Sequence, residues 1–151
     1  MTSASRHLVI LLVGAAAACR GASTGQLAPS PAEPEATIAA FLAAASGSNL
    51  EQLASLWGDE RGPSNYTNVI PPEERQRRLT IMQRILTVDE HRIMGWEPSP
   101  TRRSRRVYSV ELVREGRRAT VPFTVAASRG GGWLVAEIGL EAAVQLARPR
   151  P

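Results

Sequence analysis

The sequence contains no lysine, one cysteine and two histidines among its 151 residues, so all 18 basic side chains are arginines. A single cysteine excludes an intrachain disulfide scaffold, and this set of ligands is too small for a cysteine–histidine zinc module. No apolar run reaches the roughly 20 residues that a membrane-spanning helix needs. With 43% hydrophobic and 21% charged residues, the composition is typical of one globular domain.

The N-terminus has the pattern of a targeting segment. An apolar run over residues 8–18 follows a short polar start that carries Arg6, and the run ends in small residues, which is typical of a secretory signal peptide. Cys19 directly follows Ala16-Ala17-Ala18, an arrangement that resembles the bacterial lipobox, in which signal peptidase II cuts before a cysteine that becomes lipidated. The same alanines also fit the A-x-A rule of ordinary signal peptidase, which would release a soluble secreted protein.

We therefore expect a signal peptide over residues 1–18 and a lipid-anchored protein of the bacterial cell envelope, facing the periplasm or the exterior. Residues 19–33 begin with the lipidated cysteine and are rich in Gly, Ala, Ser and Pro, which predicts a flexible tether. The folded domain is expected over residues 34–146, followed by a disordered tail over residues 147–151.

Three stretches with apolar residues at helical spacing predict helices, over residues 36–45, 49–57 and 72–86. Pro34 and Glu35 suit the first turn of the first helix, because a proline N–H is not needed there and the helix dipole favours a carboxylate. Asn49 can cap the second helix. Residues 58–63 have the composition of a loop.

After Leu86 the apolar period changes to two, which predicts strands over residues 87–97, 106–114, 119–127 and 133–141. Glu115-Gly116 is a two-residue hairpin turn, and it places Tyr108 opposite Phe123 so that the apolar faces of the two strands coincide. Pro122 lacks the N–H that would face the following strand, so we expect a bulge or a pairing break there.

These elements predict an α+β fold with three N-terminal helices packed on a curved antiparallel sheet of about four strands. Their order resembles the nuclear transport factor 2-like superfamily, which includes the ketosteroid isomerases. The resemblance covers about residues 34–141 and implies a cone with a pocket at its open end. It also implies a possible homodimer through the outer sheet face, where the pattern places Val107, Val113, Trp133 and Val135. An ordinary, half-apolar surface explains these four residues equally well.

The strand face that would line the cone is apolar. Its residues are Tyr108, Val110, Leu112, Val121, Phe123, Ala136 and Ile138. A face without acids or bases favours a non-enzymatic domain that binds a small apolar ligand or an envelope protein partner, with no cofactor or metal.

The alternative is a pocket enzyme of the isomerase, dehydratase or hydrolase kind. Asp89 and His91 are two residues apart and share a strand face, so Asp89 could orient the imidazole, with the Tyr108 hydroxyl as a third polar group. An exposed polar pair near the start of a strand explains the same residues.

The arginines gather in the second half of the chain. The segment from Arg75 to Arg118 holds 12 arginines and five acids, a net charge of +7. Its densest run, Arg102, Arg103, Arg105 and Arg106, could contact an anionic lipid or glycolipid, because guanidinium groups bind phosphate in a bidentate manner. A solvated loop is the alternative. Nucleic acid is not an expected partner, because no aromatic residues interleave with this run.

Overall fold

A computed structural model describes residues 30–65 and 69–148. The predicted signal peptide and Cys19 lie outside the described residues. Within these two ranges, no helix is both long and apolar enough to cross a membrane.

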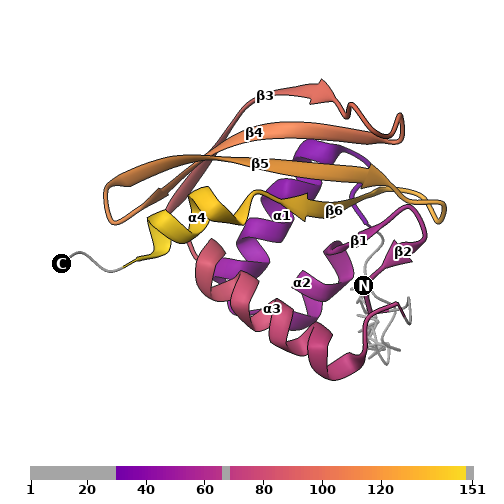
Figure 1. The fold of residues 1–151 in the computed structure, drawn as a ribbon, viewed down its shortest axis with the longest axis horizontal. Coiled ribbons are helices and arrows are strands. Elements are labelled where there is room, and N and C mark those ends of the chain that lie inside the picture. The colour runs from indigo at the N-terminus through magenta and orange to yellow at the C-terminus, as the bar shows by residue number, and fades with distance from the viewer. Residues whose placement is uncertain (1–29, 66–68, 149–151) are drawn as a thin grey trace, which may run out of the picture.

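The elements follow one another as helix, helix, hairpin, helix, four-stranded sheet and helix (Figure 1). In chain order they are α1 (Pro34–Ser46), α2 (Leu50–Leu56), β1 (Gly58–Asp59), β2 (Gly62–Pro63), α3 (Pro72–Leu86), β3 (Glu90–Pro98), β4 (Arg105–Arg114), β5 (Arg117–Ala127), β6 (Trp133–Ile138) and α4 (Leu140–Ala147). The fold class is α+β, as predicted. The expected run of three N-terminal helices is wrong, because the β1–β2 hairpin separates α2 from α3 and a further helix follows the sheet.

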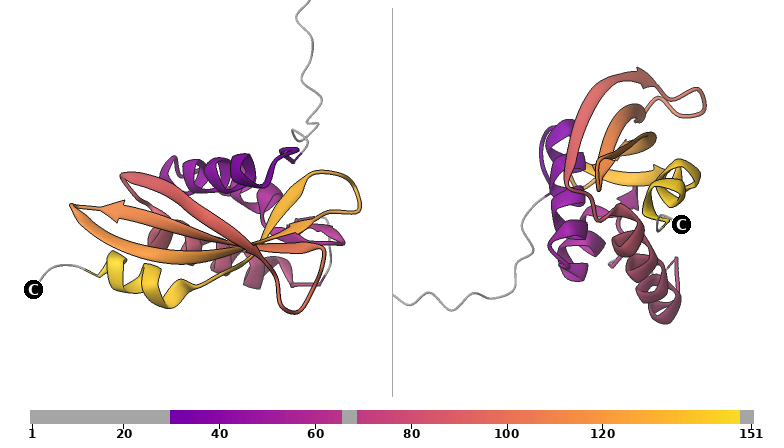
Figure 2. Two further views of the ribbon diagram at one scale, coloured as in Figure 1. Left: turned by 90° about the horizontal axis from the view of Figure 1, so that it is seen from above. Right: turned by 90° about the vertical axis from the view of Figure 1, so that its left-hand side faces the viewer.

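The main sheet is antiparallel throughout and has the strand order β3-β4-β5-β6. It is curved, and helices α1, α2 and α3 lie on its concave side (Figures 1 and 2). Because β3 and β6 are the first and last strands in this order, they form the two edges of the main sheet. The start of the small hairpin adjoins the β6 edge through a parallel bridge between Trp57 and Val135.

The helices begin where the sequence predicts. Pro34 occupies the first turn of α1, and the Asn49 side chain accepts a hydrogen bond of 3.0 Å from the backbone N–H of Gln52 at the start of α2. Helix α3 begins with a proline and two glutamates, and Glu74 pairs with Arg78 one turn later. The positions at which these three helices begin are thus explained by a capping side chain, by prolines in the first turn and by carboxylates that interact with the helix dipole.

The predicted register of the β4–β5 hairpin is confirmed. Tyr108 lies opposite Phe123. Glu115 and Gly116 have φ values of 52° and 73°, the left-handed conformation at both positions that a type I′ turn requires.

Pairing between β5 and β6 departs from a regular ladder beside Pro122, in agreement with the expected break. The ladder ends at Phe123, and a register shift lies between Thr124 and Val125. This shift reverses the faces at the start of β6. Trp133 and Val135, expected on the outer sheet face, instead pack against the core.

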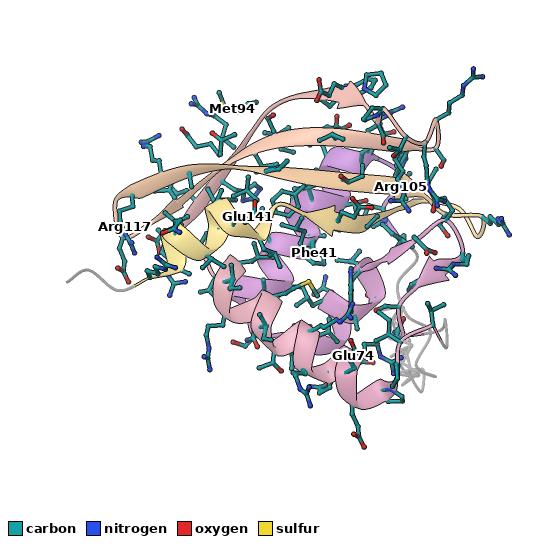
Figure 3. All side chains as sticks on the ribbon, in the orientation of Figure 1. Phe41, Glu74, Met94, Arg105, Arg117 and Glu141 are labelled. Atoms are coloured by element: carbon teal, nitrogen blue, oxygen red, sulfur yellow. The ribbon has the colours of Figure 1, made fainter. Side chains whose placement is uncertain are left out.

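The core lies between the concave face and the helices. It contains Ile38, Phe41 and Leu42 from α1 together with the inward residues of β4 and β5. Phe41 sits at its centre in the view of Figure 3.

Both ends of the domain differ from the prediction. Strand β6 ends at Ile138, and the expected tail residue Ala147 belongs to α4. Arg117 donates a hydrogen bond of 2.8 Å to the carbonyl oxygen of Arg148. The expected tether is wrong at its end, because the Pro31 carbonyl accepts a hydrogen bond of 3.1 Å from the N–H of Trp133.

Candidate functional site

Large apolar side chains are strongly exposed at two places in the described residues. Val69 (56% exposed) and Ile81 (47%) lie near α3, whereas Met94 (56%) and Trp96 (50%) lie on β3. Exposed apolar groups that cluster are more informative than single ones, because they mark binding surfaces. The first pair adjoins a pocket.

This pocket lies between α3 and β6 and has a volume of about 360 Å³. Its wall consists of Trp57, Arg78, Ile81, Met82, Ala136, Glu137, Ile138 and Leu140. Six of these eight side chains are apolar, and the two charged residues are Arg78 from α3 and Glu137 from β6. The volume falls within the range of small-molecule sites, at the lower end.

A second concavity of about 200 Å³ continues the first, because the two share Trp57, Arg78 and Ala136. Its remaining wall is Gly58, Asp59, Arg61, Ser64, Val69 and Ile70. We call the two together the α3–β6 groove. One half is apolar and the other is polar, and Arg78 stands where they join.

The local sequence explains why a groove forms there. Ala136 lies within the register irregularity of β6, opposite α3, and its methyl group is too small to fill the space. Ile81 lies away from the apolar stripe of α3 and therefore does not enter the core. Trp57 ends α2 with an extended backbone and closes the junction of the two halves.

The charges of the polar half are paired but accessible. Arg61 pairs with Asp59, and Arg78 pairs with Glu74. The Arg61 hydrogen bonds lower the pKa of Asp59 below its usual value. Both guanidinium groups are more than half exposed, so each pair is worth no more than about 1 kcal/mol and can exchange with a ligand.

A stronger ion pair fixes the β1–β2 hairpin to the sheet. Arg105 donates to the two carboxylate oxygens of Glu60 at 2.8 and 3.1 Å and also pairs with Glu137. Ser104 donates a further hydrogen bond of 2.9 Å to Glu60. The guanidinium holds the pKa of Glu60 at about 2. Figure 3 shows Arg105 at the end of the sheet next to the hairpin.

The predicted pocket lining is correct for two residues and wrong for the others. Ala136 and Ile138 line the groove. The other five residues are completely buried in the core, namely Tyr108, Val110, Leu112, Val121 and Phe123. They do face inward as predicted, but helices α1 and α4 pack against β4 and β5 and fill the concave side at that position.

The three candidate catalytic residues do not meet. Asp89 accepts a hydrogen bond of 2.7 Å from the N–H of Glu115 and so holds the hairpin turn. His91 is exposed and lies opposite Leu112, four residues along β4 from Tyr108, which corresponds to about 13 Å. An acid–base site built from these three residues is therefore wrong.

Tyr108 has a structural environment of its own. Its hydroxyl donates a hydrogen bond of 2.8 Å to Glu35 at the start of α1. Burial raises the pKa of Tyr108, and the carboxylate of Glu35 adds to this effect, while Arg106 opposes it. The phenol therefore stays protonated at neutral pH.

Three of the four arginines proposed for an anionic surface make contacts within the chain. Arg105 binds Glu60, and the Arg102 guanidinium lies 3.7 Å from the same carboxylate. Arg106 is stacked between Trp96 and Trp133, with its Cζ atom 4.6 and 4.7 Å from the two ring centres. Arg103 is exposed. The run is therefore mainly part of the folded domain rather than one free basic patch.

The outer sheet face is more polar than predicted. Val107 and Val113 do lie on it and are half-buried. Between them Glu111 pairs with Arg92 at 3.3 Å and with Arg118 at 3.0 Å.

No cluster of three or more His, Cys, Asp or Glu side chains that could hold a metal occurs in the part of the chain that the structure describes.

Neither the protein-family models nor the curated proteins compared with this chain match it. The α3–β6 groove is the best-supported candidate site, and its geometry alone identifies it. Ile81, an isoleucine off the apolar stripe of its helix, was the sequence signal that could have located it.

Proposed function

We propose that the protein is a non-enzymatic binding domain that takes a small apolar ligand in the α3–β6 groove. The apolar wall of a pocket of about 360 Å³ carries this inference. Ile81 beside it is 47% exposed and supports a ligand, because covering the remaining half of this side chain with an apolar body is favourable by about 1 kcal/mol.

The groove also favours a ligand with a polar end. Arg78 stands at the junction of the apolar and polar halves, and its exposed pairing with Glu74 leaves it able to bind a carboxylate or hydroxyl. The ligand's apolar body would contact Met82 and Ile138, and its polar group would point toward Arg78.

A neutral fluorescent apolar dye, N-phenylnaphthylamine, tests this function. Its emission should rise on binding, and Ala136→Trp, which fills the groove, should weaken binding at least tenfold. Ala43→Trp on the exposed face of α1 is the matched control and should bind as the wild type does. Equal binding by the two variants would contradict the proposed site, and no binding to the wild type would contradict a small apolar ligand as its occupant.

We also propose that residues 34–141 belong to the nuclear transport factor 2-like superfamily, a proposal that rests on the α+β class and on the antiparallel four-stranded sheet. The targeting pattern of the first 19 residues supports export to the bacterial envelope with a lipid anchor at Cys19. A ligand-binding domain held at a membrane surface is the combined function. A protein partner in the groove is the alternative occupant, and failure of the dye to bind would favour it.

A further inference from the structure

The second place where large apolar side chains are exposed is β3, an edge of the main sheet. Its nine residues are all exposed except Ile93, which is half-buried, and β3 makes its main contacts with β4. Figure 1 shows it as the outermost strand, away from the helices, and Figure 3 shows Met94 on the side of the sheet opposite to Phe41. The outer edge of such a strand carries backbone groups that can pair with another strand.

A bulge at Met94 sets which side chains share a face. Ile93 lies opposite Val110 and Gly95 lies opposite Ser109, so Met94 is an extra residue. Without it, Arg92 and Glu97, five positions apart, would lie on opposite faces of the strand. With it, both lie on the outer face, and Ile93 and Trp96 both lie on the concave face.

We propose that β3 pairs with β3 of a second copy of this chain, antiparallel and about a two-fold axis at the bulge. In that register Arg92 faces Glu97 of the second copy, and Ile93 faces its Trp96. Because of the two-fold symmetry, each of these two contacts occurs twice in the dimer. The two four-stranded sheets become one continuous sheet of eight strands, and Glu97, which has no ion pair among the described residues, gains a partner.

The charges specify this register. A shift that brings Glu90 opposite Glu97 places like charges across the strands, which is unfavourable. Charges, bulges and prolines often protect an edge strand from pairing. In the proposed pairing, Arg92 and Glu97 of the two copies attract each other. The bulge lies on the two-fold axis, so both strands have it at the same place. Pro98, which lacks an N–H, stands at the end of the strand, where it interrupts little.

Sedimentation equilibrium of the full chain, with a reducing agent so that Cys19 cannot form a crosslink, tests this interface. The wild type should show a reversible dimer. Glu97→Arg places two arginines opposite each other and should raise the dimer dissociation constant about tenfold. Arg92→Glu should have the same effect, and the double variant Arg92→Glu/Glu97→Arg should restore the dimer to within about threefold of the wild type.

Glu90→Arg is the matched control, because it reverses a charge on the same face of the same strand but outside the predicted pairs. It should leave the dissociation constant unchanged. A wild type that stays monomeric overturns the interface. A dimer that none of the charge reversals weakens, or one that the double variant fails to restore while its circular dichroism matches the wild type, also overturns it and assigns association to another surface.

Discussion

The ion pair between Glu60 and Arg105 leads to a quantitative prediction about stability. The two side chains are only 16% and 11% exposed, and they join the β1–β2 hairpin to β4. Glu60→Gln keeps the shape of the side chain and one acceptor but removes the charge. The hairpin forms part of the polar half of the α3–β6 groove, so the same change also tests whether the groove depends on this contact.

The magnitude follows from the pKa of Glu60, which is about 2 in the fold against an ordinary value of 4.5. At ~1.36 kcal/mol for each pH unit, this difference corresponds to about 3 kcal/mol of stability at neutral pH. Because glutamine retains a neutral hydrogen bond, we expect Glu60→Gln to lower the free energy of unfolding by about 2–3 kcal/mol at pH 7.

The pH dependence has a definite sign. The pKa is lowered by folding, so the ionised carboxylate stabilises the fold fully above pH 4.5, and this contribution is lost as the pH falls toward 2. About 2 kcal/mol of it is already lost at pH 3. The difference between wild type and Glu60→Gln should therefore shrink markedly between pH 7 and pH 3.

Urea unfolding followed by tryptophan fluorescence at pH 7 and pH 3 measures this difference. Glu90→Gln, a change to an exposed carboxylate on β3 with no ion pair among the described residues, is the control and should change stability by less than about 0.5 kcal/mol at either pH. A Glu60→Gln effect of equal size at both pH values would refute the reasoning, because it would show that the charge of Glu60 contributes nothing.

Three further predictions concern other contacts. Gly139→Ala should destabilise the domain by about 1–3 kcal/mol in thermal unfolding, because its Cβ atom would lie 2.5 Å from the ring of Pro122; an unchanged melting temperature would contradict this close approach. Tyr108→Phe should lower the free energy of unfolding by about 1 kcal/mol through loss of the hydrogen bond to Glu35, as urea titration would measure. Metabolic labelling with a fatty acid should mark the wild type but not Cys19→Ser, and label on both would exclude this cysteine as the anchor.

The sequence predicted most accurately the elements whose causes are local. The β4–β5 hairpin depends on two turn residues and on alternation in the flanking strands, so Tyr108 could be placed opposite Phe123 before any coordinates. The start of α2 depends on one side chain, Asn49, and was equally accessible. Such features need only a few neighbouring residues.

The sequence pattern does not predict helix α4, because the first residue of this helix continues the alternation of the strand before it. Leu134, Ala136, Ile138 and Leu140 alternate, which favours one long strand. Gly139 ends that strand, and its N–H donates a hydrogen bond of 2.9 Å to the carbonyl of Pro122. Ala143 and Leu146, three residues apart, are both buried, and this is the helical spacing that distinguishes α4 from a longer strand.

The position of the groove depends on a contact that alternation cannot reveal. The missing N–H of Pro122 predicts disturbed pairing, but the pattern of the sequence does not show where the register of β6 shifts. The register shift between Thr124 and Val125 puts Val135 into the core and leaves Ala136 facing α3, whereas strict alternation from Leu134 would have put Val135 outside. Since one inserted residue exchanges the two faces of a strand, a pocket that begins at a bulge lies where the period-two pattern fails. The same holds for β3, where the extra residue Met94 brings Arg92 and Glu97 onto one face, so both candidate surfaces of this protein arise from irregularities in an otherwise regular sheet.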